Sequence, residues 1–353
     1  MCRTPRTHLS GAAKERLDRG IPIQSLTKNI YYFIMIETQR PPQDTLPSFY
    51  REAGLHGTHV YLPELVPSAS DLVLKFGNRY AVKKEDLMAA FYADPFDVRH
   101  REGTFLSAID YLKRDWVVKM MRVHQDAEYF HRFAATTAVI QQINSSYLAR
   151  IEASTLLPGP DGQFFPTVIM PYYNGISADR LGEGHGAINP LRMADAIQQI
   201  GYGLDLLHFY GVIHSDVAPK NILLLRGAQT RPQAVLIDYG ASYLAKRHRL
   251  HPPPAIWSTP KYMAPELNSD GGMGTFAADQ YSLALTAEEL LERTPLSPFT
   301  TLSGLLIKDR LPKTVANVIS KATAPIPDQR FGSAGEFGFE LYDAVRKHVA
   351  QTS

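Results

Sequence analysis

The sequence predicts an α+β chain with two lobes, a small one rich in strands and a large helical one, preceded by an N-terminal extension. Short strand-like stretches at 104–109 and 116–122 precede a helical segment at 126–143, and another strand follows at 167–172. Beyond Asn189, helical periodicity dominates. A strand-rich front and a helix-rich back imply two lobes with a cleft between them, where ligands usually bind.

Composition sets the broad class. A hydrophobic fraction of 44% and a charged fraction of 20% are those of an ordinary soluble globular protein. Lys and Arg number 37 against 35 Asp and Glu, so we expect neither a nucleic-acid nor a membrane partner. The single cysteine, Cys2, cannot form an intramolecular disulfide, and the longest apolar run, 30–36, is too short to span a bilayer. The expected location is cytoplasmic, with secretion into another cell left open.

The chain divides into three predicted parts. Residues 1–28 are expected to be a disordered tail, and 29–95 an extension or a small α/β subdomain. Residues 96–350 form the main domain, with a small lobe at 96–170 and a large lobe at 175–350.

Local patterns justify the individual elements. Residues 72–82 carry a hairpin signal around Gly77 and Asn78, and 84–92 form a short predicted helix that ends before Pro95. After Asn189, one apolar stripe at helical spacing predicts a long amphipathic helix. Its members are Leu191, Ala194, Ile197, Ile200, Leu204 and Leu207.

The most informative residues follow that helix. Asp216 lies five residues before Asn221 in a loop that leads into an apolar strand, and a later strand delivers Asp238 into a glycine turn. Phosphoryl transfer needs a carboxylate that accepts a hydroxyl proton, and oxygen ligands for divalent cations. Each feature alone is weak, because a lone Asp-Tyr-Gly is usually only a turn.

Together these segments resemble the protein kinase superfamily, in particular divergent eukaryotic-like Ser/Thr kinases. Residues 214–221 are similar to the catalytic loop, Asp238 and the two residues after it to the metal-binding turn, and 263–266 to the end of the activation segment. Asp279 resembles the aspartate that braces the catalytic loop. Arg330 resembles the late arginine that pairs with the glutamate ending the activation segment. The resemblance implies a bilobal protein-kinase-like fold.

The resemblance also implies an activity: ATP-dependent phosphoryl transfer, with Mg²⁺, to Ser or Thr hydroxyls of a protein substrate. Asp216 would be the base, and Asn221 and Asp238 the metal ligands. Lys220 would reach the transferring phosphate, although a solvated surface lysine remains an open alternative. Thr259 would bond the catalytic aspartate, as in the Ser/Thr class.

The nucleotide site is implied in the same way. Lys119 is similar to the lysine that holds the α- and β-phosphates, whereas its rival Lys83 lies too early in the chain. Segment 101–108 falls where the glycine-rich phosphate cover belongs, and only the middle one of its three glycines is retained. Met170 would border the adenine pocket, with an ordinary core methionine as the open alternative. The remaining implied nucleotide-binding residues are Gly103, Ala108, Val117, Pro171, Tyr173 and Leu223.

Several positions depart from the family pattern. Ser215 replaces the arginine that usually receives an activation-loop phosphate, and Ala218 replaces a lysine of the Ser/Thr class. The small-lobe helix lacks the glutamate expected to pair with Lys119. Thr136 occupies its expected position, and Glu128 lies at the wrong end of the helix. Two interpretations therefore stay open: an atypical active kinase, or a nucleotide-binding pseudokinase that serves as a scaffold or allosteric partner. A third, a kinase for a small molecule such as a sugar or choline, is disfavoured because such relatives generally lack the Ala-Pro-Glu segment and the late arginine.

One further substitution is milder. Tyr239 replaces the more usual phenylalanine of the metal-binding turn. With Ile140 and His214 it is expected to complete a stack of side chains that links the two lobes.

Overall fold

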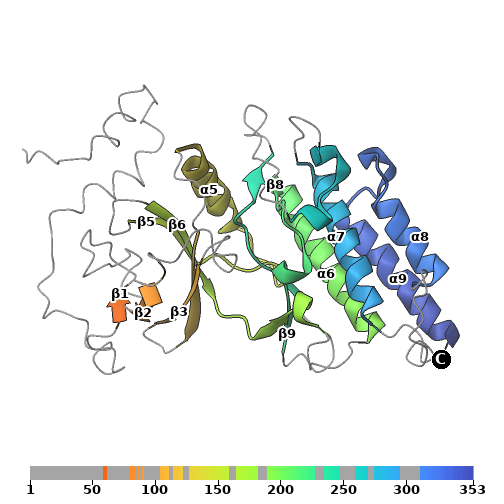
Figure 1. Ribbon diagram of the computed structural model, residues 1–353, viewed down its shortest axis with the longest axis horizontal. Helices are drawn as coiled ribbons and strands as arrows, with labels where there is room; N and C mark the ends of the chain where they lie inside the picture. Colours follow the sequence, from red (N-terminus) through yellow and green to blue (C-terminus); the bar gives the residue numbers. More distant parts are fainter. Residues whose placement is uncertain are drawn as a thin grey trace, which may run out of the picture.

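The computed structural model shows the predicted two-lobed α+β architecture (Figure 1). The structure describes residues 59–61, 80–83, 86–87, 90, 104–110, 114–121, 127–158, 164–181, 189–226, 234–245, 259–268, 274–294 and 311–352. Everything below concerns these residues. The predicted tail at 1–28 lies outside them, and the predicted domain boundaries stay predictions.

The small lobe is built on an antiparallel six-stranded sheet. In spatial order its strands are β1 (His59–Tyr61), β2 (Tyr80–Lys83), β3 (Thr104–Asp110), β4 (Asp115–Met120), β6 (Phe164–Pro171) and β5 (Ala153–Pro158). Strands β1 and β2 belong to the predicted extension at 29–95, and β2 pairs with β3. The described strands of the extension therefore enlarge the small-lobe sheet. The turn of the predicted hairpin around Gly77 is not among the described residues.

The two faces of this sheet have different roles, because side chains alternate along a strand. On one face Leu106, Trp116, Val118 and Ile169 form a small apolar core. The opposite face of β4 and β6 carries Val117, Lys119, Val168 and Met170, and its apolar members pack on the core that continues into the large lobe.

Helix α5 (Ala127–Ile140) connects the lobes. It packs on β5 of the small lobe and on two short strands of the large lobe, β8 (Val212–Ile213) and β11 (Tyr243–Leu244). Its buried side chains include Phe133 and Ile140, which belong to the large core that continues into the large lobe. The helix therefore contacts elements of both lobes.

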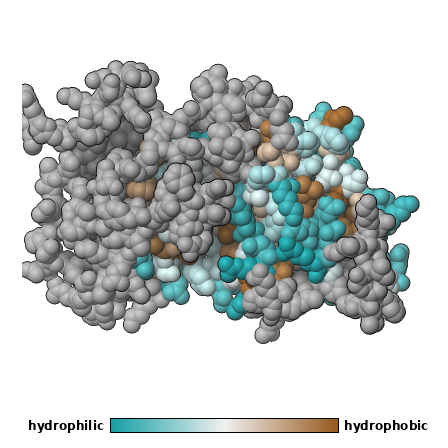
Figure 2. All heavy atoms as spheres, in the orientation of Figure 1, coloured by the Kyte–Doolittle hydropathy of each residue, from teal (hydrophilic) through white to brown (hydrophobic). Residues whose placement is uncertain are grey.

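The large lobe consists mainly of four packed helices: α6 (Pro190–Phe209), α7 (Phe276–Glu292), α8 (Lys313–Ala322) and α9 (Ala334–Thr352) (Figure 1). Helix α6 begins at Pro190, after Asn189, whose side chain accepts a hydrogen bond from the Leu191 amide at 2.9 Å. The predicted stripe of α6 is buried except for Leu191, which is only partly buried. On the side shown in Figure 2, the described helical surface is mostly hydrophilic, as expected when the apolar sides face inward.

Helices α6 and α9 approach each other closely through glycine. A Cβ atom added at Gly201 would lie 2.5 Å from the carbonyl oxygen of Ala334, so only glycine fits there. None of the described helices is long and apolar enough to cross a membrane.

Short elements carry the loops at the cleft. A three-stranded sheet pairs β10 (Ala234–Leu236) with β9 (Ile222–Leu225) and β9 with β7 (Gly175–Ser177), while β11 pairs with β8. The described 3₁₀ helices are η3 (Ala178–Arg180), η4 (Pro219–Asn221), η6 (Pro260–Tyr262), η7 (Pro265–Asn268) and η8 (Pro327–Gln329). Strands β9 and β10 bring the ends of the two chemically important loops together.

Candidate active site

A buried aspartate of α7 holds the loop at 214–218 in place. Asp279 accepts hydrogen bonds from the amides of His214 and Ser215, both at 2.8 Å, and its Oδ2 lies 2.9 Å from Nε2 of His208. Ser215 has a left-handed backbone with φ of 69°, which a non-glycine residue adopts only when its surroundings impose it. The expected bracing role of Asp279 is confirmed in this geometry.

Asp216 is held at both carboxylate oxygens. Its Oδ1 accepts from the Thr259 hydroxyl at 2.6 Å and from the Thr259 amide at 2.8 Å. Its Oδ2 accepts from the Asn221 side-chain amide at 2.9 Å and forms an ion pair with Lys220 at 3.2 Å. The implied contact of Thr259 with Asp216 is therefore present, and Lys220 is an ion-pair partner of that carboxylate.

Hydrogen bonds fix the orientation of the Asn221 side-chain amide. Its Nδ2 also donates to the backbone carbonyl of Asp216 at 2.8 Å, so the side-chain oxygen is the atom left to face a cation. The backbone carbonyl of Asn221 accepts from the Ile237 amide at 2.9 Å. That bond joins the catalytic loop to the residue before Asp238, and so brings the two predicted metal ligands to neighbouring positions.

Asp238 stands in a strained turn. Its backbone is left-handed with φ of 71°, and its Oδ1 accepts from the Gly240 amide at 3.1 Å. Its Oδ2 forms a buried ion pair with Nζ of Lys119. Burial raises the pKa of the Asp238 carboxyl, but the adjacent Lys119 ammonium outweighs this and holds the pKa below its usual range.

This donor set fits Mg²⁺. The ion prefers oxygen ligands and is usually held by one or two carboxylates together with substrate phosphates. An ionised Asp238 and the amide oxygen of Asn221 are ligands of that kind. Among the described residues, no group of three or more His, Cys, Asp or Glu side chains is placed to hold a metal ion. The remaining ligands of a cation at this site would be water or the phosphates of a nucleotide.

Lys119 lacks the predicted type of helix partner in the described part of α5. The lysine is 1% exposed, pairs with Asp238, and lies 5.1 Å above the centre of the Phe105 ring. Thr136 is buried, and its hydroxyl has no hydrogen-bond partner among the residues described. Glu128 lies in the first turn of α5, far from Thr136 along the helix. Among the described residues, the carboxylate of Asp238 is thus the partner of Lys119 in place of a helix carboxylate.

The sheet register corrects one predicted nucleotide-binding residue. Ala108 pairs with Trp116 and is buried in the small apolar core, on the face opposite Lys119. The prediction that it lines the nucleotide site is wrong, because a shift of one residue along a strand reverses the face. Phe105 pairs with Lys119 and Ser107 with Val117, so these two residues lie on the same face as Lys119 and Val117 instead. The polar Ser107 between apolar Leu106 and Ala108 was the available signal.

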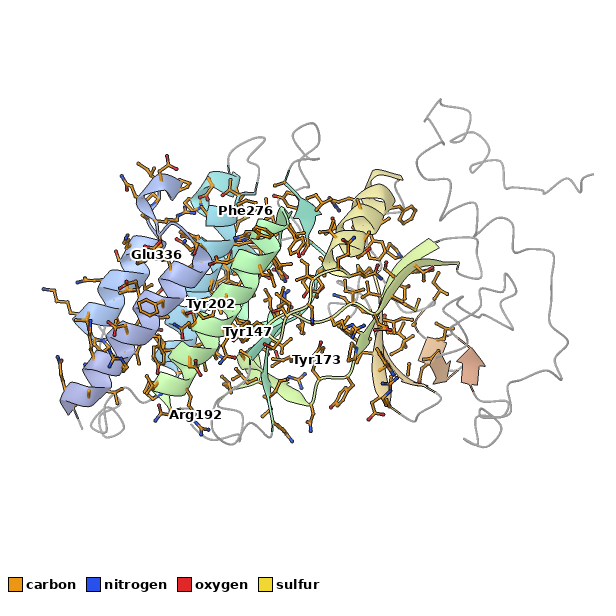
Figure 3. All side chains as sticks on the ribbon, turned by 180° about the vertical axis from the view of Figure 1, so that it is seen from behind. Tyr147, Tyr173, Arg192, Tyr202, Phe276 and Glu336 are labelled. Atoms are coloured by element: carbon orange, nitrogen blue, oxygen red, sulfur yellow. The ribbon has the colours of Figure 1, made fainter. Side chains whose placement is uncertain are left out.

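The other predicted nucleotide residues that the structure describes lie on β4, on β9, or on β6 and the segment just after it. Val117 and Leu223 are only partly buried, whereas their neighbours Val118 and Ile222 are almost fully buried. Met170 is on the same face of the sheet as Val117 and belongs to the large core. Pro171 ends β6. Tyr173, two residues later, lies where the sheet meets the large lobe (Figure 3). Gly103 lies outside the described residues.

A stack of side chains links the lobes. The rings of His214 and Tyr239 meet edge to face, with centroids 5.7 Å apart, and Ile140 belongs to the same core as Tyr239. Burial lowers the pKa of His214, although the nearby carboxylates of Asp279, Asp216 and Asp238 oppose that effect. The ring therefore favours its neutral form inside the stack.

The end of the activation segment is tied to the start of α9. Arg330, which is buried, donates from both terminal nitrogens to the two carboxylate oxygens of Glu266, at 2.8 and 2.7 Å. Such a two-pronged pair fixes both direction and distance. The pairing that the resemblance implied is confirmed.

Comparison with known proteins identifies the family. The sequence model described as the protein kinase domain matches residues 102–331. The chain therefore belongs to the protein kinase family.

Individual relatives are serine/threonine-protein kinases. PknH of Mycobacterium tuberculosis (strain H37Rv) is 32% identical over 198 residues, which are 52% of this chain and 30% of that protein. PknD of M. tuberculosis (strain CDC 1551) is 32% identical over 209 residues, or 54% of this chain and 30% of that one. The chain thus spans less than a third of the length of these curated relatives. The crystal structure of the M. tuberculosis PknI kinase domain is 25% identical, with a TM-score of 0.52, covering 70% of this chain and 91% of that one.

Proposed function

We propose that this protein is a serine/threonine kinase that transfers the γ-phosphoryl group of ATP to hydroxyl groups of protein substrates. The observation that carries the proposal is the meeting of two loops. Asp216, Asn221 and Asp238 are joined there by the hydrogen bonds of Asn221 to Asp216 and of Ile237 to Asn221. The serine/threonine kinase names of the relatives support the same class.

Each residue has a distinct task in this proposal. Asp216 accepts the proton of the substrate hydroxyl, and its orientation is maintained by Thr259 through Oδ1. Asn221 and Asp238 hold Mg²⁺, which, when bound with ATP, offsets the charge on the phosphates. Lys119 holds the α- and β-phosphates. Lys220, 3.2 Å from Asp216, lies beside the base, where its charge can stabilise the transferring phosphoryl group.

The nucleotide base would lie between the lobes. Val117 from β4 and Leu223 from β9 offer apolar surfaces for adenine, and Met170 borders the pocket. The backbone of Pro171 and Tyr173 supplies hydrogen bonds to the base. Phe105 and Ser107 join this set because their register places them on the same face as Lys119 and Val117.

A second function, nucleotide binding without turnover, is favoured by one observation. Lys119 occupies the carboxylate of Asp238, which would otherwise be free to bind a cation. A chain in which this pair excludes Mg²⁺ from Asp238 when nucleotide arrives would be a pseudokinase and would act as a scaffold or allosteric partner.

Transfer of labelled phosphate decides between the two. The purified chain, supplied with Mg²⁺ and ATP labelled at the γ-phosphate, is expected to phosphorylate itself or a generic basic protein on Ser or Thr. Because a positioned base contributes about 10²–10⁴-fold, Asp216→Asn should reduce the rate by at least about 100-fold. Transfer of labelled phosphate by Asp216→Asn at the wild-type rate would show that Asp216 is not the base.

A matched binding measurement completes the test. Mg·ATP should raise the melting temperature of the wild-type chain, since a ligand that binds only the folded state stabilises it. A thermal shift without any phosphoryl transfer would favour the pseudokinase. The absence of both would contradict the proposed function.

A further inference from the structure

A single peptide group, the one between Ala149 and Arg150, is held at both ends by tyrosine hydroxyls. Its carbonyl oxygen accepts a hydrogen bond from Tyr239 at 2.9 Å. Its amide donates a hydrogen bond to the hydroxyl oxygen of Tyr173, also at 2.9 Å. Tyr239 follows Asp238 and Tyr173 follows β6, so the peptide group joins two parts of the candidate site.

This peptide is itself well anchored. The Ala149 amide donates to the Leu236 carbonyl at 2.8 Å, and the Leu236 amide donates to the Tyr147 carbonyl at 2.9 Å. Leu148 and Ala149 are both buried. Leu236 ends β10, two residues before Asp238. The peptide is therefore a fixed reference point against the strand that delivers Asp238.

The two tyrosines are suited to this contact. Burial raises the pKa of the Tyr239 hydroxyl and of the Tyr173 hydroxyl above the ordinary value. Both groups remain protonated at neutral pH. A phenylalanine at position 239 would keep an aromatic ring in the stack with His214 but would lose the bond to Ala149.

The position of Lys119 depends on this peptide through Tyr239 and Asp238. Asp238 has a left-handed backbone, a conformation that persists only when neighbouring contacts impose it. The adjacent Tyr239 is one such contact, since its ring is buried and its hydroxyl is bonded. Asp238 in turn holds Lys119. With Thr136 where a helix carboxylate was expected, the position of the lysine depends on Asp238 and therefore on Tyr239.

We propose that Tyr239 and Tyr173 are positioning residues for phosphoryl transfer. By holding the two ends of the Ala149–Arg150 peptide group, they keep Asp238, and through it Lys119, in place for the phosphates of the nucleotide. The hydroxyl of Tyr239 thus compensates for the helix carboxylate that this chain lacks at position 136. This inference rests on the proposed function, because it assigns the phosphates of ATP to Lys119.

The first experiment compares ligands with and without phosphates. Calorimetry on the full chain measures the affinity for Mg·ATP and for adenosine in the wild type and in Tyr239→Phe, Tyr173→Phe and the double variant. Tyr210→Phe is the matched control, because Tyr210 belongs to the large lobe and its side chain is exposed. Loss of one hydrogen bond should weaken Mg·ATP binding by Tyr239→Phe about three- to tenfold. In Tyr239→Phe the affinity for adenosine should change less than about twofold, and so should the affinity for Mg·ATP in the Tyr210→Phe control.

The double variant tests the shared peptide. If both hydroxyls position one group, the loss in the double variant should be smaller than the product of the two single losses. Equal weakening of adenosine and Mg·ATP, or no weakening of Mg·ATP, would overturn the proposal. A loss of affinity in the double variant equal to the product of the two single losses would also overturn the proposal.

The second experiment needs no nucleotide. The rate at which acetic anhydride modifies Lys119, followed by mass spectrometry, should rise several-fold in Tyr239→Phe because its ion pair is loosened. Hydrogen exchange at the Arg150 amide should be faster in Tyr173→Phe. Unchanged Lys119 modification in Tyr239→Phe overturns the positioning role.

The two experiments fail in different ways. If the wild type binds no Mg·ATP, the proposed function fails, while Lys119 modification still decides on the tyrosines. Should Tyr239→Phe not fold, Tyr173→Phe decides the proposal through the same measurements. Faster exchange at Arg150 together with faster Lys119 modification would support it, and unchanged Lys119 modification would overturn it.

Discussion

Thr259 gives Asp216 two of its hydrogen bonds, and both reach the same oxygen. The backbone bond survives any substitution that preserves the local fold, whereas the hydroxyl bond depends on the residue type. Hydrogen bonds to charged groups contribute more than those between neutral groups. The side chain of Thr259 is therefore expected to affect catalysis far more than folding.

Thr259→Val removes this hydroxyl and keeps the shape of the side chain. A hydrogen bond to a charged group contributes about 1.5–3 kcal/mol, so we expect the turnover rate to fall about 10- to 100-fold. Initial rates of labelled phosphate transfer measure the effect. Thr352→Val, whose hydroxyl bonds only helix carbonyls at the exposed end of α9, should stay within about twofold. Equal rates for wild type and Thr259→Val would remove Thr259 from the account.

Single residues also mark the limit of what the sequence predicts. Motif order and spacing predict Asp216, Asn221, Asp238 and Lys119 as site residues, because their types and separations are specific. The partner of Lys119 could not be predicted in this way. The ion pair with Asp238 joins residues far apart in the chain and forms where position 136 offers only a hydroxyl.

At the scale of elements, Glu289 ties the activation segment to α7. Its carboxylate accepts from the Tyr262 hydroxyl at 2.6 Å and from Lys261 at 2.5 Å, and it also contacts Arg293. Burial raises the pKa of Glu289, but these donors outweigh it and leave the pKa below 4.5. On the same helix, burial and the neighbouring Glu292 raise the pKa of Glu288 above 4.5. The two glutamates should therefore respond to pH in opposite ways.

Glu289→Gln should lower the free energy of unfolding at pH 7, by about 1 kcal/mol or less for partly exposed ion pairs. A depressed folded-state pKa means that the stabilisation is fully present above 4.5 and is lost as the pH falls through the lower folded value. The difference in the free energy of unfolding between wild type and Glu289→Gln, measured by urea unfolding, should therefore narrow below about pH 4.5.

Glu288→Gln is the matched control. Its raised pKa predicts a neutral or slightly stabilising effect at pH 7 that disappears as the pH falls. A Glu289→Gln gap that widens on acidification, or a loss of stability in both variants at pH 7, would contradict this assignment.

Strand register shows why elements are predicted less precisely than motifs. The sequence located a strand over 104–109, and the structure has it at β3 (Thr104–Asp110). Which residues face the cleft depends on pairing with β4, and that pairing places Ser107 there instead of Ala108. The pairing of β2 with β3 has a similar origin, because non-local contacts leave little trace in local periodicity.

At the scale of the whole molecule, the buried charged side chains of the candidate site lie where the two lobes meet. Helix α5, the His214–Tyr239 stack and the Ala149–Arg150 peptide all cross or border this junction. The two-lobed fold was predictable because a strand-rich region precedes a helix-rich one. The internal links between the lobes were not, since each depends on hydrogen bonds between distant segments.

The central claim is that oxygen atoms of Asn221 and Asp238 hold a magnesium nucleotide beside Asp216. The most direct measurement is calorimetric titration of the full wild-type chain with ATP, with Mg²⁺ and with Mg²⁺ removed by chelation. The account predicts at least about tenfold tighter binding with Mg²⁺, equivalent to about 1.4 kcal/mol, and loss of this difference in Asp238→Ala. Equal affinity with and without Mg²⁺ in the wild type would contradict it.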